Sequence, residues 1–156
     1  MFSRTITAAL LLTCFNGVAF AQERVWSLDT PANQAYLIFG VPDTEDVGLS
    51  LWCEVGKGQM ALYIPEPRIA LRVGETVAMM ITLDGAQKSL RGVAAKDAAS
   101  GQMTVEGKFG LKDILISRLQ TAQSITVTVK GHANTFPFGD ANFADLLSVC
   151  KGEDVN

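Results

Sequence analysis

LSLWCEVGKGQMALYI, residues 49–64, predicts an antiparallel β-hairpin, and similar patterns recur along the chain. Side chains in its first half alternate between two faces. One face carries Leu49, Leu51, Cys53 and Val55, and the other carries Ser50, Trp52 and Glu54. Gly56-Lys57-Gly58 suits a tight turn because glycine readily adopts positive φ. Residues 59–64 are then expected to return as the second strand.

The fold class expected from the whole chain is mainly β. Further strands are expected at 26–28, 35–39, 69–73, 76–83, 87–94, 103–109, 124–129 and 135–138. Glycine, proline or polar turn residues separate these short segments, as in all-β domains. We therefore expect an antiparallel β-sandwich or partly open barrel, with an α+β fold around one bent sheet as the alternative.

Two short helices are expected in the C-terminal half, where the apolar spacing changes from two residues to three or four. The first lies within 111–122 and the second follows Asp140, a suitable N-cap, and ends at Lys151-Gly152. One face of the second helix carries Phe143, Leu146, Leu147 and Cys150.

The N-terminal residues 1–21 have the pattern of a secretory signal peptide. Arg4 precedes an apolar run over 6–18, and Ala19-Phe20-Ala21 supplies small residues for cleavage. The run is shorter than the roughly 20 residues of a transmembrane anchor, and no second stretch is long enough to cross a bilayer. We expect a single β-rich domain over 22–156 in the periplasm or outside the cell.

The cysteines then predict one disulfide. Cys14 would leave with the signal peptide, and the small residue that lipidation favours is replaced by Thr13. Cys53 and Cys150 remain, on a strand face and a helix face that both require burial. A redox-active pair is the alternative, but the sequence has neither CxxC spacing nor a histidine beside Cys53.

Composition gives little support for catalysis or nucleic-acid binding. Without Arg4 the charged residues are 12 basic and 16 acidic, so no basic footprint for nucleic acid is expected. There is no glycine-rich nucleotide motif, and the single histidine, His132, lies in an expected turn. We expect no catalytic residue, no metal and no cofactor.

Two stretches are candidate binding surfaces. Asp43, Glu45 and Asp46 form an acidic loop that could be merely solvated, or could meet calcium or a basic partner, or supply an acid/base pair. Trp52 and Glu54, with Tyr63 nearby, could form an aromatic patch. Burial of the two aromatic residues in the core is the preferred alternative.

The order of elements resembles the invasion-associated locus B family of small exported bacterial proteins. The likeness covers 60–83, 115–129 and 136–147, and its closing segment runs from Phe138-Gly139-Asp140-Ala141 to Leu147. This resemblance implies an exported envelope protein with a binding or host-surface role. The partner would be a protein or envelope component, and the oligomeric state is left open.

A second resemblance is to periplasmic C-type lysozyme inhibitors. It rests on Trp52-Cys53, on Cys150 and on Ser100-Gly101-Gln102-Met103. This alternative implies an inhibitor of a cell-wall-degrading enzyme, with Ser100 and Lys108 as the residues to test.

Overall fold

The computed structural model describes residues 23–65 and 68–153. The expected signal peptide, 1–21, lies outside the described residues, as does the chain end from 154 to 156. No helix in the described ranges is long and apolar enough to cross a membrane.

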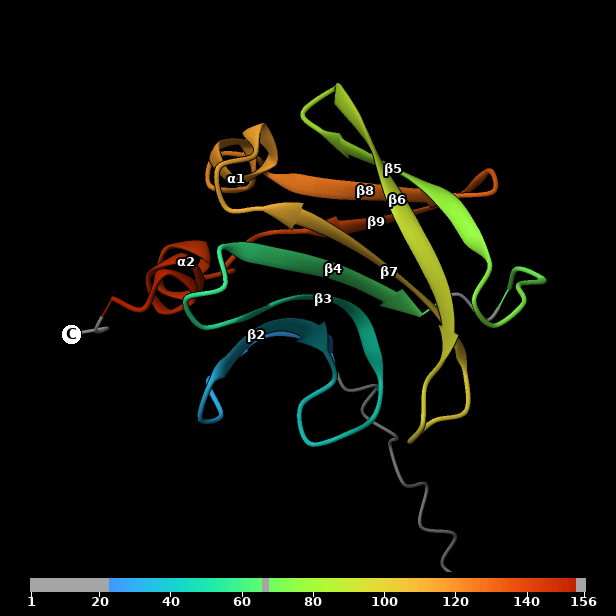
Figure 1. The fold of residues 1–156 in the computed structure, drawn as a ribbon, viewed down its shortest axis with the longest axis horizontal. Coiled ribbons are helices and arrows are strands. Elements are labelled where there is room, and N and C mark those ends of the chain that lie inside the picture. The colour runs from blue at the N-terminus through green and yellow to red at the C-terminus, as the bar shows by residue number, and fades with distance from the viewer. Residues whose placement is uncertain (1–22, 66–67, 154–156) are drawn as a thin grey trace, which may run out of the picture.

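The described chain forms one antiparallel sheet that curls into a half-barrel (Figure 1). Its spatial order is β1-β2-β3-β4-β7-β6-β5-β8-β9. The strands are β1 (Val25–Asp29), β2 (Gln34–Gly40), β3 (Val47–Glu54), β4 (Gln59–Pro65), β5 (Thr76–Leu83), β6 (Ala86–Lys96), β7 (Met103–Gly110), β8 (Ser124–Val129) and β9 (His132–Pro137). The expected partly open barrel is thereby confirmed.

Aromatic side chains bring the two edges of the sheet together. Trp26 in β1 donates its indole N–H to the carbonyl of Pro137 in β9 over 2.7 Å. Phe39 in β2 meets Phe136 in β9 edge to face, with ring centroids 5.9 Å apart. The edge strands are thus joined by side chains rather than by a backbone ladder, which is why the barrel stays partly open.

The core fills the concave side of the sheet. Strand β5 buries Val77, Met79, Ile81 and Leu83 at alternate positions. Gly92 and Gly107, paired across β6 and β7, make room for Met79. A Cβ on Gly92 would come within 2.7 Å of Met79 Cγ, so a side chain there would collide with the core.

Both helices lie at the same end of the half-barrel (Figure 1). Helix α1 is Ile114–Leu119, within the expected 111–122, and Asp113 caps it by accepting a hydrogen bond from the Leu115 amide. Helix α2 is Phe143–Lys151, and its C-terminus is the left-handed Gly152, as expected. The expected N-cap Asp140 is wrong, because Asn142 accepts the bond from the Asp145 amide.

The disulfide between Cys53 and Cys150 is present as expected. It joins β3 to α2 across 97 residues of sequence, with Cα atoms 5.8 Å apart. The Gly56 amide donates to the Cys150 carbonyl over 3.0 Å and so satisfies one of the last carbonyls of the helix. The hairpin and α2 are therefore joined by a disulfide and by a backbone hydrogen bond, both at Cys150.

The expected strand at 69–73 is wrong. This segment is irregular, and the Glu75 carboxylate accepts a hydrogen bond from the Arg72 amide. Ile69 and Leu71 still pack partly against the core. The apolar alternation therefore reflects burial of an irregular segment and not a ladder partner.

Removing the disulfide should lower the free energy of unfolding by about 4 to 5 kcal/mol, because it closes a loop of nearly 100 residues. We expect a Cys53→Ala/Cys150→Ala double variant to lose this amount in urea unfolding. Intact-mass analysis after alkylation without reductant should find no labelled thiol on either cysteine. Two labelled thiols, or equal stability of the double variant, would contradict the assignment.

The corrected N-cap gives a paired test. Asn142→Ala should cost about 1 kcal/mol of unfolding free energy because α2 loses its capping oxygen. Asp140→Ala is the matched control and should change stability by less than half as much. Thermal and urea unfolding of the two variants measures both values. A larger loss of stability in Asp140→Ala than in Asn142→Ala would restore Asp140 as the cap.

Candidate functional site

The convex side of β2, β3, β4 and β7 carries a mixed aromatic and charged surface, here called the outer face. Its central row is Tyr36, Trp52, Ala61 and Lys108, which are successive register partners across the four strands. A second row contains Tyr63 and Glu106. The alternation that buries Leu51 and Cys53 inside also places Trp52 outside.

Trp52 contacts three other side chains of the outer face. Tyr36 stacks on its ring, with centroids 5.8 Å apart and an interplanar angle of 19°. The Lys108 ammonium lies 5.6 Å from the Trp52 ring centroid, and the Trp52 indole N–H donates to Glu106 over 3.1 Å. These contacts fix the rotamer of Trp52 while its surroundings stay open to solvent.

The preferred expectation that Trp52 and Tyr63 are core residues is wrong. Both are half-buried on the outer face and neither belongs to the core cluster. Lys108 and Glu54 on the same face are exposed, so the barrel interior lies on the other side of the strands. Because the strands of the described residues form a single curled sheet, none of these residues forms a second sheet over this side.

Tyr63 marks the end of the outer face near the turn between β6 and β7. Its hydroxyl donates to Asp97 over 3.3 Å. Burial of the ring, followed by the nearby Asp97 carboxylate, raises the pKa of Tyr63 to about 12. Asp97 itself accepts hydrogen bonds from the Ser100 amide and hydroxyl, and these bonds lower the pKa of its carboxyl below the ordinary value.

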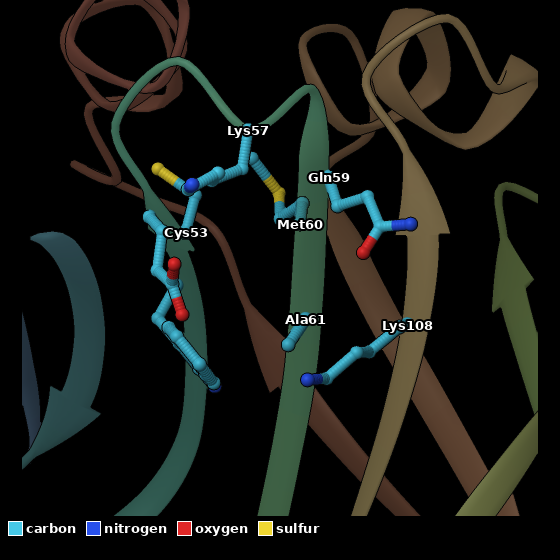
Figure 2. A pocket seen from close by; sticks show the side chains of 8 residues that line it. Cys53, Lys57, Gln59, Met60, Ala61 and Lys108 are labelled. Carbon is cyan, nitrogen blue, oxygen red and sulfur yellow. The ribbon is translucent and has the colours of Figure 1, made fainter.

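A pocket of about 320 Å³ opens at the other end of the outer face, between β3 and β4 (Figure 2). Lys57 extends from the turn toward Cys53 on the β3 side, and Lys108 extends from β7 toward Ala61. We call this the fork pocket; its lining residues are Trp52, Cys53, Glu54, Lys57, Gln59, Met60, Ala61 and Lys108.

The fork pocket exists because the two hairpin strands diverge. Their register runs through Ser50–Tyr63 and Leu51–Leu62 and stops at Trp52–Ala61. Beyond that point β3 continues pairing with β2 as far as Glu54, while β4 pairs with β7 from Gln59 onward.

Separate anchors hold the two sides of the turn apart. On the β3 side, Cys53 is bonded to Cys150 and the Gly56 amide binds the same helical residue. On the β4 side, the Gly58 carbonyl accepts a hydrogen bond from the Leu111 amide over 3.0 Å. The turn is thus tied both to α2 and to the segment before α1.

The acidic loop lies apart from Trp52 and Glu54. Asp43, Glu45 and Asp46 precede β3, whereas Glu54 ends it, and an eight-residue strand spans roughly 23 Å. Asp46 pairs with Arg24 at 2.6 Å, and both side chains are about half exposed. The acidic loop is therefore distant from Glu54, and Glu45 instead shares a hollow with Tyr63 at the far end of the outer face.

Ser100 and Lys108 have different surroundings. The Ser100 hydroxyl is bonded to Asp97 at 2.9 Å and stabilises the β6–β7 turn. Lys108 lies 3.6 Å from Glu106 and lines both the fork pocket and a neighbouring hollow beside Tyr63. Only Lys108 is part of the outer-face cluster around Trp52.

Other chemistry-bearing residues are scattered. His132 is exposed as the first residue of β9, next to the turn at Lys130-Gly131. Within 23–65 and 68–153, no group of three or more histidine, cysteine or carboxylate side chains could hold a metal ion.

Sequence reasoning missed Tyr36, Glu106 and Lys57 as neighbours of Trp52. Alternation within 103–109 does place Glu106 and Lys108 on one face. Alternation does not predict the strand order, however. In the sheet β4 pairs with β7 and not with β5, although β5 is closer in sequence. The sequence places Lys57 only in the turn, because nothing in it indicates that β3 and β4 separate before they reach the turn.

The raised pKa of Tyr63 predicts a loss of stability at alkaline pH. An unfolded tyrosine ionises near pH 10, whereas folded Tyr63 keeps its proton to about pH 12. Its contribution is therefore complete below pH 10 and declines as pH rises from 10 to 12. Relative to Tyr63→Phe, the wild type should lose on the order of 1 to 2 kcal/mol over this window, with solvent screening taken into account. Urea unfolding at stepped pH measures the difference, and parallel pH profiles would contradict it.

Comparison with protein-family models, curated proteins and solved structures finds no match for this chain.

Proposed function

We propose that this chain is an exported, non-catalytic binding protein of the bacterial envelope. Its outer face around Trp52 recognises a protein or another envelope component. The observation that carries this proposal is the packing of Trp52 between Tyr36 and Lys108 on a face that remains open to solvent.

The energetics of Trp52 favour a recognition role. Tryptophan, tyrosine and arginine supply most hot spots in protein interfaces, and prior fixation of a side chain reduces the entropy lost on binding. Tyr36 and Glu106 hold Trp52 in one orientation before any partner arrives. Exposed Glu54 and Lys108 provide a polar rim around it.

The titratable groups support a role without turnover. The pKa of Asp113 is lowered by the Leu115 amide and then by Lys88, as expected for a helix cap. The pKa of Glu75 is lowered first by its hydrogen bond to Lys130. The pKa of Asp97 is lowered by its hydrogen bonds to Ser100 in the same turn. Each shift thus has a structural cause outside the fork pocket.

Export is supported by two independent features. Residues 1–21 have the pattern of a signal peptide. The Cys53–Cys150 disulfide suits an oxidising compartment such as the periplasm or the cell exterior.

Site-specific photo-crosslinking tests the proposed surface. A benzoylphenylalanine at position 54 should form a discrete adduct with an envelope component in intact cells. The same group at position 114, which is exposed on α1, serves as the matched control and should not. Adding Trp52→Ala or Lys108→Ala should reduce the adduct, since hot-spot truncation costs about 2 kcal/mol or roughly thirtyfold in Kd.

Equal adducts at positions 54 and 114, or an adduct unchanged in a folded Trp52→Ala variant, would contradict the proposal. Circular dichroism establishes that each variant is folded. Inhibition of a wall-degrading lysozyme that is lost in Lys108→Ala and Ser100→Ala would favour the inhibitor alternative instead.

A further inference from the structure

The fork pocket contains polar side chains that the fold does not use. Glu54, Lys57 and Gln59 are exposed, and none of their side-chain polar groups bonds to another residue in the described part of the chain. Buried Cys53, Met60 and Ala61 line the inner side of the same space. Free polar groups above an apolar floor are the general make-up of a small-ligand site.

We propose that the fork pocket binds a carboxylate, either of a small organic acid or of the C-terminal residue of a peptide. This inference rests on the proposed function as a binding protein and names the ligand chemistry of its outer face.

Charge selects an anionic ligand group. Lys57 comes from the turn and Lys108 from β7, and both are exposed (Figure 2). Lys57 forms no ion pair within the described residues, and the contact of Lys108 with Glu106 is long at 3.6 Å. A carboxylate bound in the fork pocket would gain charge-assisted contacts with these ammonium groups, which have no carboxylate closer than 3.6 Å among the described residues.

The interrupted ladder adds a reason to favour a peptide end. Register between β3 and β4 stops at Trp52–Ala61, so the facing edges at Glu54 and Gln59 are not paired as strands. Backbone edges of this kind accept an additional extended segment, and capture of a terminal carboxylate is a recurring mode of peptide recognition.

Size and the remaining charge limit the ligand further. A volume of about 320 Å³ is at the lower end of the small-ligand range, enough for one or two small residues. Glu54 supplies a negative charge at the same opening and disfavours a second carboxylate. We therefore expect a monocarboxylate with a short apolar side chain.

Titration by two-dimensional ¹H–¹⁵N NMR tests the proposal with three probes: N-acetyl-Ala-Ala, its C-terminal amide, and propionate. The free-acid dipeptide should shift the Trp52 indole and the Gly56 and Gly58 amides in a saturable way. The Trp26 indole, bonded to Pro137 at the barrel seam, is an internal control that should not move. Propionate binding as tightly as the dipeptide would assign the site to small acids, whereas weaker propionate binding would assign it to peptide ends.

Lysine variants supply the decisive comparison. Lys57→Met and Lys108→Met should each weaken binding of N-acetyl-Ala-Ala about tenfold, equivalent to about 1.4 kcal/mol. Lys96→Met is the matched control, because Lys96 is exposed at the end of β6 and outside the fork pocket. It should bind like the wild type.

Equal shifts with the amide, no saturable shift with either acid, or equal weakening by Lys96→Met would overturn the proposal. Such a result would leave the proposed function intact if the crosslink at position 54 still formed. Loss of that crosslink together with retained dipeptide binding would instead overturn the macromolecular role and keep the carboxylate site.

Discussion

The bond between Cys53 and Cys150 is the constraint on which the rest of the structure depends. It joins α2 to the β3–β4 hairpin. The Gly56 amide in the hairpin turn also donates a hydrogen bond to the carbonyl of Cys150. Without it, α2 would be held at the end of the half-barrel only by side-chain packing and by the backbone hydrogen bond from Gly56 to Cys150. The small curled sheet thus gains a closed end from one covalent link between distant parts of the chain.

The same link shapes the outer surface. It holds the β3 side of the hairpin to α2, while the Gly58–Leu111 hydrogen bond holds the β4 side toward β7. The strands part after Trp52 and Ala61, and the fork pocket lies in the gap. The disulfide that stabilises the interior therefore also helps to place Lys57 and Lys108 at the same pocket on the exterior.

Local patterns in the sequence predicted most of the fold. Alternation identified the strands and the inward direction of Cys53, and apolar spacing on the last helix identified Cys150 as its partner. Alternation failed at 69–73, where Ile69 and Leu71 pack without a ladder. The site was harder to predict, because the approach of Tyr36 and Lys108 to Trp52 depends on strand order, which local periodicity does not contain.

The hairpin of β3 and β4 is held open beyond Trp52 and Ala61. Cross-strand nuclear Overhauser effects measure this directly in the oxidised protein. We expect contacts between the backbones of Ser50 and Tyr63 and between those of Trp52 and Ala61, and none between those of Glu54 and Gln59. Strong backbone contacts between Glu54 and Gln59 would show a closed ladder and contradict the open hairpin.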